Sequence, residues 1–394
     1  MVAALMAINA LSIDVMLPAL PEIGKTFAIS SENDRQLVVV VYVISSGIAQ
    51  LFYGPLADAL GRRRVLMGAL SVYLVGALLC LIAPTFGLFL AARCVQGLSA
   101  AATRVVATAL VRDLVAGPRM AQIMSTAMTI FMIVPILAPG IGQLILLVGP
   151  WRWIFALLLF AGVSLFVWSY FRVPETLPPE RRIPLSFAGA FDAYRQVVST
   201  PVTIGYTIAL SLTFGAIFSF LTSSQQVFVE IFKMGALFPL GFSSIAVALS
   251  AAQFTNSRIV MRVGMRRLAH FALTGFTALA ILHTIHALFF EENLYVFLGM
   301  LLPTMFLFAF TGPNFNAIAM EPMGHVAGAA SAFMGFISTV AGATIGAIIG
   351  QAYNGTIIPL VAGQAVLGLS ALGVVALVER GKLYPRVNPD HPLH

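Results

Sequence analysis

Long apolar runs separated by short polar turns form the dominant pattern along this chain. About twelve runs approach the roughly 20 residues that a helix needs to cross a bilayer. Their approximate centres are Leu11, Ser46, Val75, Leu98, Val134, Phe160, Leu212, Val247, Leu279, Phe306, Ile337 and Ser370. Proline and glycine interrupt several runs, and a bilayer helix tolerates both. The pattern predicts an all-α membrane protein with twelve transmembrane helices.

Composition agrees with this prediction. Hydrophobic residues make up 59% of the chain and charged residues 9%, whereas soluble domains carry roughly 25% charged residues. Cys80 and Cys94 both lie inside apolar runs, so a disulfide framework is not expected. The chain is therefore expected to be embedded in a lipid bilayer.

The distribution of Lys and Arg predicts the topology. Placing the N-terminus in the cytoplasm assigns sixteen basic residues to one set of loops, and only Lys25, Arg35, Arg152 and Lys233 to the other. Because cytoplasmic loops carry the excess of basic residues, both termini are expected to be cytoplasmic. The net charge of +7 is then a consequence of topology, and no nucleic-acid partner is expected.

The longest polar interruption contains PETLPPERRIP and divides the chain near its middle. Because it is rich in proline and basic residues and lacks a span-length apolar run, it is interpreted as a cytoplasmic linker. The predicted organisation is a six-helix bundle over 1–173, the linker over 174–200, a second six-helix bundle over 201–379 and a cytoplasmic tail over 380–394.

Two short basic turns indicate an internal repeat. GPLADALGRRR, residues 54–64, follows the second span, and NSRIVMRVGMRR, residues 256–267, follows the eighth. Aligning Gly61 with Gly264 puts Met261 opposite Asp58, so the glycine and arginines persist while the acid is lost. Same-direction repeats of six spans are typical of transporters with a binding site near the membrane midplane between the halves.

GPLADALGRRR resembles the signature loop between helices 2 and 3 of the major facilitator superfamily. Further segments resemble its bicyclomycin/chloramphenicol-resistance type of drug:proton antiporters: SIDVMLPALP, ARCVQGLSAAA, VRD, PILAPGIG, WRWIF, PETLPPERR and NSRIVMRVG. They cover nearly the whole chain in the expected order. The resemblance implies two pseudo-symmetric six-helix bundles and a monomer.

For the first basic turn, the resemblance implies a gate. Asp58 would face the start of the eleventh span and hold the inward gate shut. The residues expected to take part are Gly54, Asp58, Gly61, Arg62, Arg63 and Arg112, with Asp113 as a local partner. The alternative, simple anchoring of a tight turn at the cytoplasmic surface, explains the arginines but leaves the acid unexplained.

Asp14 is the only acidic residue placed well inside a span. An ionisable residue there costs about 2.5 to 3.5 kcal/mol on insertion scales and is a functional candidate by default. Its proton occupancy depends on whether the surroundings are wet and on which charges stand nearby. We therefore expect Asp14 to couple transport to protons. The alternative is an interfacial acid near Lys25.

Arg93 lies within the fourth span, and the resemblance maps it onto the buried arginine of the helix-4 motif. It would contact substrate or favour ionisation of Asp14. Arg104 follows just over three full helical turns later, on the same face, at a position that is usually apolar in the family. If both arginines face the cavity, an anionic or zwitterionic substrate is favoured over a lipophilic cation. The alternative for Arg104 is snorkelling to the cytoplasmic surface.

The fifth span carries PILAPGIG, which resembles the antiporter motif of the family. Pro135, Pro139, Gly140 and Gly142 are expected to bend the helix and admit a close neighbour. Other residues could line the cavity, or else make interhelical hydrogen bonds worth about 0.6 kcal/mol. They are Asn9, Tyr42, Gln50, Gln225, Gln253, Asn314 and Asn316, with Phe214 and Phe218 as apolar walls.

Other chemistry is not indicated. His283 and His286 lie one helical turn apart without a third ligand in view, so no metal site is expected. No GxxxxGK[ST] loop is present, and no cofactor is expected. A nucleophile–base pattern typical of an enzyme is also missing.

The predicted function is proton-coupled efflux of small organic molecules across a bacterial cytoplasmic membrane. The alternative is transport of a dedicated anionic metabolite such as a siderophore.

Overall fold

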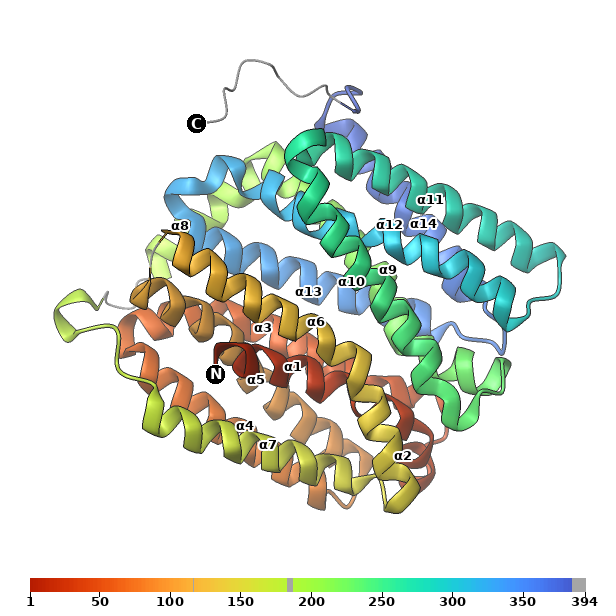
Figure 1. Ribbon diagram of the computed structural model, residues 1–394, viewed down its shortest axis with the longest axis horizontal. Coiled ribbons are helices and arrows are strands. Elements are labelled where there is room, and N and C mark those ends of the chain that lie inside the picture. The colour runs from red at the N-terminus through yellow and green to blue at the C-terminus, as the bar shows by residue number, and fades with distance from the viewer. Residues whose placement is uncertain (116, 183–186, 385–394) are drawn as a thin grey trace. The chain divides into compact units, whose positions relative to one another are not determined.

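The computed structural model describes residues 1–115, 117–182 and 187–384, and these contain helices and no strands (Figure 1). The helices are α1 (Val2–Asp14), α2 (Leu20–Thr26), α3 (Leu37–Leu60), α4 (Arg62–Ile82), α5 (Phe86–Leu114), α6 (Gly117–Val148), α7 (Arg152–Arg172), α8 (Phe187–Ser199), α9 (Pro201–Gln225), α10 (Phe238–Val263), α11 (Met265–Phe289), α12 (Leu294–Met320), α13 (Ala327–Gln351) and α14 (Ile358–Val378). A π-helical turn, Gln226–Ile231, extends α9.

Twelve helical segments in the described part of the chain are long and apolar enough to cross a bilayer. Each contains one of the twelve centres expected from the sequence, so the span prediction is confirmed. A lipid environment offers no hydrogen bonds to the backbone, and helices satisfy every such group internally. For this reason Pro135 and Pro139 lie inside a continuous α6, and Pro303 and Pro313 inside a continuous α12.

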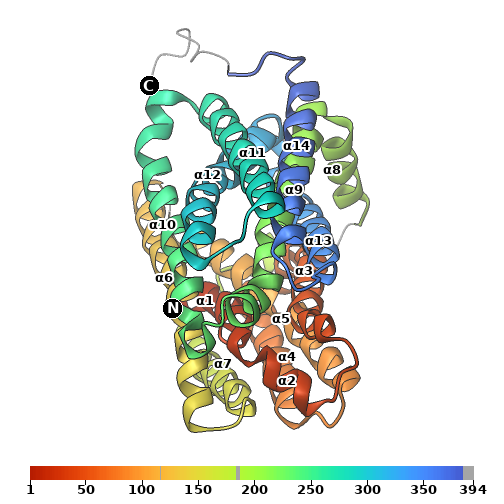
Figure 2. The ribbon, with the colours of Figure 1, turned by 90° about the vertical axis from the view of Figure 1, so that its right-hand side faces the viewer.

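The chain divides into two compact units. Unit 1 contains residues 1–191 together with 235–243, and unit 2 contains residues 192–234 together with the chain from Ser244 onward. Within unit 1, α1 packs against α6, and α4 packs against both α5 and α7. Within unit 2, the corresponding pairs recur as α9 with α13, α11 with α12 and α11 with α14 (Figure 2).

The two basic turns have the same backbone geometry. Gly61 separates α3 from α4 with φ of +100°, and Gly264 separates α10 from α11 with φ of +86°. Glycine is the residue that adopts positive φ without steric cost. The repeat seen in the sequence is therefore also a repeat of local structure.

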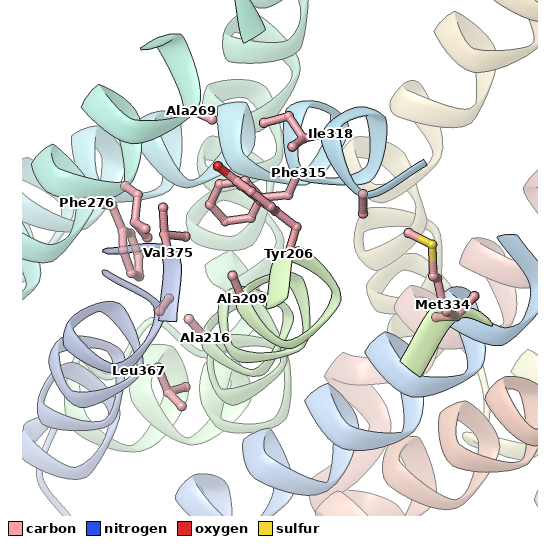
Figure 3. Close-up of a cluster of buried hydrophobic side chains, with 14 of the residues drawn as sticks. Tyr206, Ala209, Ala216, Ala269, Phe276, Phe315, Ile318, Met334, Leu367 and Val375 are labelled. Atoms are coloured by element: carbon pink, nitrogen blue, oxygen red, sulfur yellow. The ribbon is translucent and has the colours of Figure 1, made fainter. Parts of the chain in front are cut away.

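Small and aromatic residues build the core of unit 2. Tyr206 and Ala209 on α9 pack against Phe315 and Ile318 on α12, and Val375 on α14 belongs to the same cluster (Figure 3). Alanines on α9 let neighbouring helices approach closely, which replaces the missing hydrophobic driving force in lipid by van der Waals contact.

Candidate functional site

Asp14 ends α1 with 6% of its surface exposed. Its carboxylate has no recorded hydrogen bond or ion pair among the described residues. Helix α6 packs directly beside it, since a Cβ on Gly142 would overlap the carbonyl oxygen of Val15. Gly140, by contrast, has open space around it. The close approach of α1 and α6 therefore requires Gly142 in particular.

Arg93 on α5 is fully buried and its guanidinium group is held by three helices. Nε donates to the carbonyl of Val38 at 3.2 Å, Nη1 to Oε1 of Gln96 at 2.6 Å, and Nη2 to the carbonyl of Ser12 at 3.1 Å. The guanidinium carbon lies 4.3 Å from the centre of the Tyr42 ring. Each nitrogen thus makes one hydrogen bond within the protein.

Several predicted cavity residues belong to the same network. The Tyr42 hydroxyl donates to Oδ1 of Asn9 at 2.8 Å, which joins α3 to α1. Ser12 and Tyr73 hydroxyls lie 2.7 Å apart and connect α1 to α4. The sequence analysis assigned no role to Ser12 or Tyr73. Serine and tyrosine in apolar spans are common, and nothing in their spacing indicates this contact.

Arg104 differs from Arg93 although both lie on α5. Arg104 is exposed, and its guanidinium has no recorded partner in the ranges that the structure describes. Gln50 is half-buried on α3. On the helix face that the two arginines share, Arg93 is therefore fully buried and hydrogen-bonded, whereas Arg104 has an exposed side chain.

The turn between α3 and α4 is organised around Arg62, which is 4% exposed. Its Nη2 lies 2.6 Å from Oδ1 of Asp58, and its Nε lies 3.1 Å from Oδ2 of Asp113. The structure thus brings together three of the predicted gate residues. Arg112 is exposed without a recorded contact in the described ranges, and Gly54 has open space around it.

Glu175 completes this turn, a role that the sequence analysis did not assign. Its Oε1 accepts hydrogen bonds from the backbone N–H of Arg62 at 2.9 Å and of Leu177 at 3.1 Å. A Cβ on Gly61 would lie 2.5 Å from its other oxygen. Glu175 belongs to the PETLPPERR segment, which the sequence analysis identified as part of the linker. Its contact with a turn over 100 residues away leaves no signal in the local sequence.

In unit 2, α9 presents Phe214 and Phe218 with ring centres 5.2 Å apart. Gly342 and Gly346 on α13 pack against these two residues, and a Cβ on either glycine would overlap them. The predicted apolar walls therefore also form the contact between α9 and α13.

The predicted polar residues of unit 2 fall into two environments. Asn314 is buried and donates to Oδ1 of Asn256 at 2.8 Å, an interhelical hydrogen bond between α12 and α10. Asn316 is exposed. Gln253 donates to the carbonyl of Ala309 at 3.0 Å. Gln225 is 1% exposed, and neither of its amide atoms has a hydrogen-bond partner in the described structure.

A second ionic network lies at the α10–α11 turn. The Tyr206 hydroxyl donates to Oε1 of Glu379 at 2.7 Å and lies 2.8 Å from Nε2 of His270. Arg266 pairs with Glu379 at 3.2 Å and with Glu321 at 2.8 Å. In each unit, then, a glutamate that follows the sixth span contacts the basic turn between the second and third spans.

The two histidines of α11 share one carboxylate. Nδ1 of His286 lies 2.9 Å and Nε2 of His283 3.4 Å from Oε1 of Glu292. A search of the described residues found no group of three His, Cys, Asp or Glu residues that could hold a metal ion. His286 is therefore within hydrogen-bond distance of Glu292, whereas Nε2 of His283 has no hydrogen-bond partner in the described structure.

Comparison with known proteins places this geometry in context. The family model described as Major Facilitator Superfamily matches residues 2–347. An uncharacterized MFS-type transporter, YdgK of Bacillus subtilis, is 30% identical over 349 residues, covering 86% of this chain and 85% of that protein. A bicyclomycin resistance protein homolog of Haemophilus influenzae is 29% identical over 361 residues, covering 88% and 87%.

The multidrug resistance protein MdtL of Escherichia coli is 32% identical over 255 residues, covering 63% of this chain and 61% of that protein. Among solved structures, the xylose transporter XylE from E. coli superposes with a TM-score of 0.70 at 13% identity, covering 99% of this chain and 98% of that one. The fold and the repeated turns therefore have one explanation: the chain belongs to the major facilitator superfamily and is a multi-pass membrane transporter, not an enzyme.

Proposed function

We propose that this protein exports small organic molecules across the bacterial cytoplasmic membrane in exchange for protons. Two relatives are named for resistance to bicyclomycin or to multiple drugs. Both termini would be cytoplasmic, because the basic turns after the second and eighth spans would then face the cytoplasm. The transporter would work as a monomer.

The observation that carries the proton coupling is the state of Asp14. A buried carboxylate without a fixed internal partner can exchange a proton without breaking an ion pair. Deprotonated Asp14 would favour the substrate-loaded inward state, and protonation from outside would release the substrate. Arg93 would act by holding α1, α3 and α5 in register around Asp14.

Within unit 1, the half-buried Asn9 would contact substrate, and the buried Tyr42 would position it. Within unit 2, the half-buried Phe214 would contact substrate, with the buried Phe218 packed against it. The gate would use Asp58, since its ion pair with Arg62 can exchange for a helix N-terminus.

The alternative, a transporter for an anionic metabolite, has weaker support. It requires Arg93 and Arg104 to bind a carboxylate of the substrate together. Each side-chain nitrogen of Arg93 already donates to an acceptor within the protein. Arg104 alone is exposed.

The test is bicyclomycin binding to purified protein between pH 5 and 9. If one substrate molecule exchanges for one proton, the affinity for substrate falls by up to about tenfold for each pH unit of acidification. Asp14→Asn should remove this dependence, while Asp192→Asn, an exposed acid outside the spans, should keep it. An unchanged pH profile in Asp14→Asn would exclude the coupling role. Absence of bicyclomycin-driven proton flux in wild-type proteoliposomes would exclude this drug as a substrate.

A further inference from the structure

A pocket lined by basic residues lies beside α4 and α7 of unit 1. These two helices pack side by side (Figure 1). It has a volume of about 550 Å³. Arg63 and Arg64 at the start of α4 line it together with Tyr170 near the end of α7, and Glu175 and Arg182 follow α7. None of the roles discussed above uses this pocket.

The pocket carries an excess of hydrogen-bond donors. Arg64 is exposed, and its side chain has no recorded contact among the described residues. Nε of Arg182 is buried and lacks a hydrogen-bond partner in the described structure. Arg63 is anchored, since Nη2 donates to the carbonyl of Tyr170 at 2.7 Å and its guanidinium lies over the Tyr170 ring. Three guanidinium groups thus converge on one space.

The pocket has one carboxylate, that of Glu175, against three guanidinium groups. Oε1 of Glu175 accepts two backbone hydrogen bonds, and no ion pair between Glu175 and an arginine is recorded in the described part of the chain. The net charge of the lining is therefore positive. Guanidinium groups that keep free N–H donors beside a cavity suit an anion with several oxygens, such as a phosphate group, which they bind bidentately.

The rest of the lining is mostly apolar; its one further polar residue is Ser71, whose hydroxyl donates to the carbonyl of Met67. Met67, Gly68 and Phe166 line the pocket below the arginines. The same helices continue away from it with exposed apolar side chains, among them Val75 at 53% and Val167 at 46%. A soluble anion would satisfy the arginines but leave this groove empty. A molecule with a phosphate head and hydrocarbon tails fills both parts.

We propose that this pocket binds the headgroup of an anionic phospholipid, with Arg64 and Arg182 on the phosphate and an acyl chain along Met67, Gly68 and Phe166. Glu175 links the site to the α3–α4 turn through the backbone N–H of Arg62. The site does not depend on the proposed efflux activity, because lipid binding is measured without substrate.

The test is native mass spectrometry of delipidated protein in detergent, titrated with phosphatidylglycerol or with phosphatidylcholine of the same chains. Wild-type protein should bind phosphatidylglycerol at least tenfold more tightly. The double variant Arg64→Gln/Arg182→Gln should lose this preference. Arg267→Gln, an exposed arginine at the repeat position of Arg64, should keep it.

A second variant separates a lipid from a free anion. Gly68→Phe leaves every charge in place and fills the apolar wall, where the glycine now has open space. This variant should bind phosphatidylglycerol at least tenfold more weakly than wild-type protein does. Equal affinity for the two lipids, an equal loss in Arg267→Gln, or displacement of phosphatidylglycerol from wild type by millimolar inorganic phosphate would each overturn the proposal.

Discussion

Replacing Arg93 by lysine is the most direct test of how the N-terminal helices are held together. The substitution keeps a positive charge on α5 but replaces a planar fork with five donors by a single ammonium group. That group cannot reach the carbonyls of Ser12 and Val38 and the amide of Gln96 together, because they lie on three different helices. Lysine therefore retains about one of the three hydrogen bonds.

The expected cost follows from these contacts. Two lost hydrogen bonds to a charged group are worth roughly 1.5 to 3 kcal/mol each. Rearrangement of the lysine chain recovers a part, so we expect a net destabilisation of about 3 kcal/mol. For a unit of about 200 residues, this lowers the unfolding midpoint by roughly 6 to 12 °C.

The assay is thermal unfolding in detergent, followed by loss of helical circular dichroism. The matched control is Arg104→Lys, the same substitution on the same helix at an exposed position without a recorded contact among the described residues. It should stay within about 2 °C of wild type, because exposed substitutions typically change stability by less than about 0.5 kcal/mol. If Arg93→Lys and Arg104→Lys have the same unfolding midpoint, the hydrogen bonds of the buried Arg93 guanidinium do not hold the helices together, and the reasoning is refuted.

Two further stability predictions use paired variants and the same assay. Gly76→Ala should destabilise by about 1 to 3 kcal/mol, because its Cβ would lie 2.8 Å from the backbone nitrogen of Gln96. Gly68→Ala on the same helix meets open space and should be neutral or stabilising by up to about 1 kcal/mol; equal melting of the two variants would contradict the packing argument. Tyr206→Phe should cost about 1 to 3 kcal/mol, because it removes the hydroxyl shared by a histidine and a glutamate. Tyr295→Phe, at a residue 86% exposed, should cost nothing measurable, and a similar loss in both would show that the buried hydroxyl is not the cause.

Lipid binding, the pH dependence of bicyclomycin binding and thermal unfolding are three independent measurements, and each tests a different proposal. A negative result for lipid binding does not affect the proposed proton coupling. A negative result for proton coupling does not affect the proposed lipid site. Arg93→Lys reports on packing within unit 1 alone. If Arg93→Lys unfolds at the wild-type temperature but no longer transports substrate, Arg93 contacts substrate directly and is not only a positioning residue.

The number of spans, the family and the positions of the two basic turns are all readable from the amino-acid sequence. A bilayer forces each apolar run of about 20 residues into a helix, so the hydropathy pattern is enough to count them. Gly61 and Gly264 were recognisable as a repeat because both turns require positive φ, and glycine meets that requirement.

Only the tertiary structure decided which polar residues meet. Periodicity places Arg93 and Arg104 on one face, but it cannot tell that α1 and α3 cover the first and leave the second exposed. Glu175 contacts a turn over 100 residues earlier in the chain. Such contacts depend on the packing of helices distant in sequence, and local pattern carries no information about which neighbours a helix face will acquire.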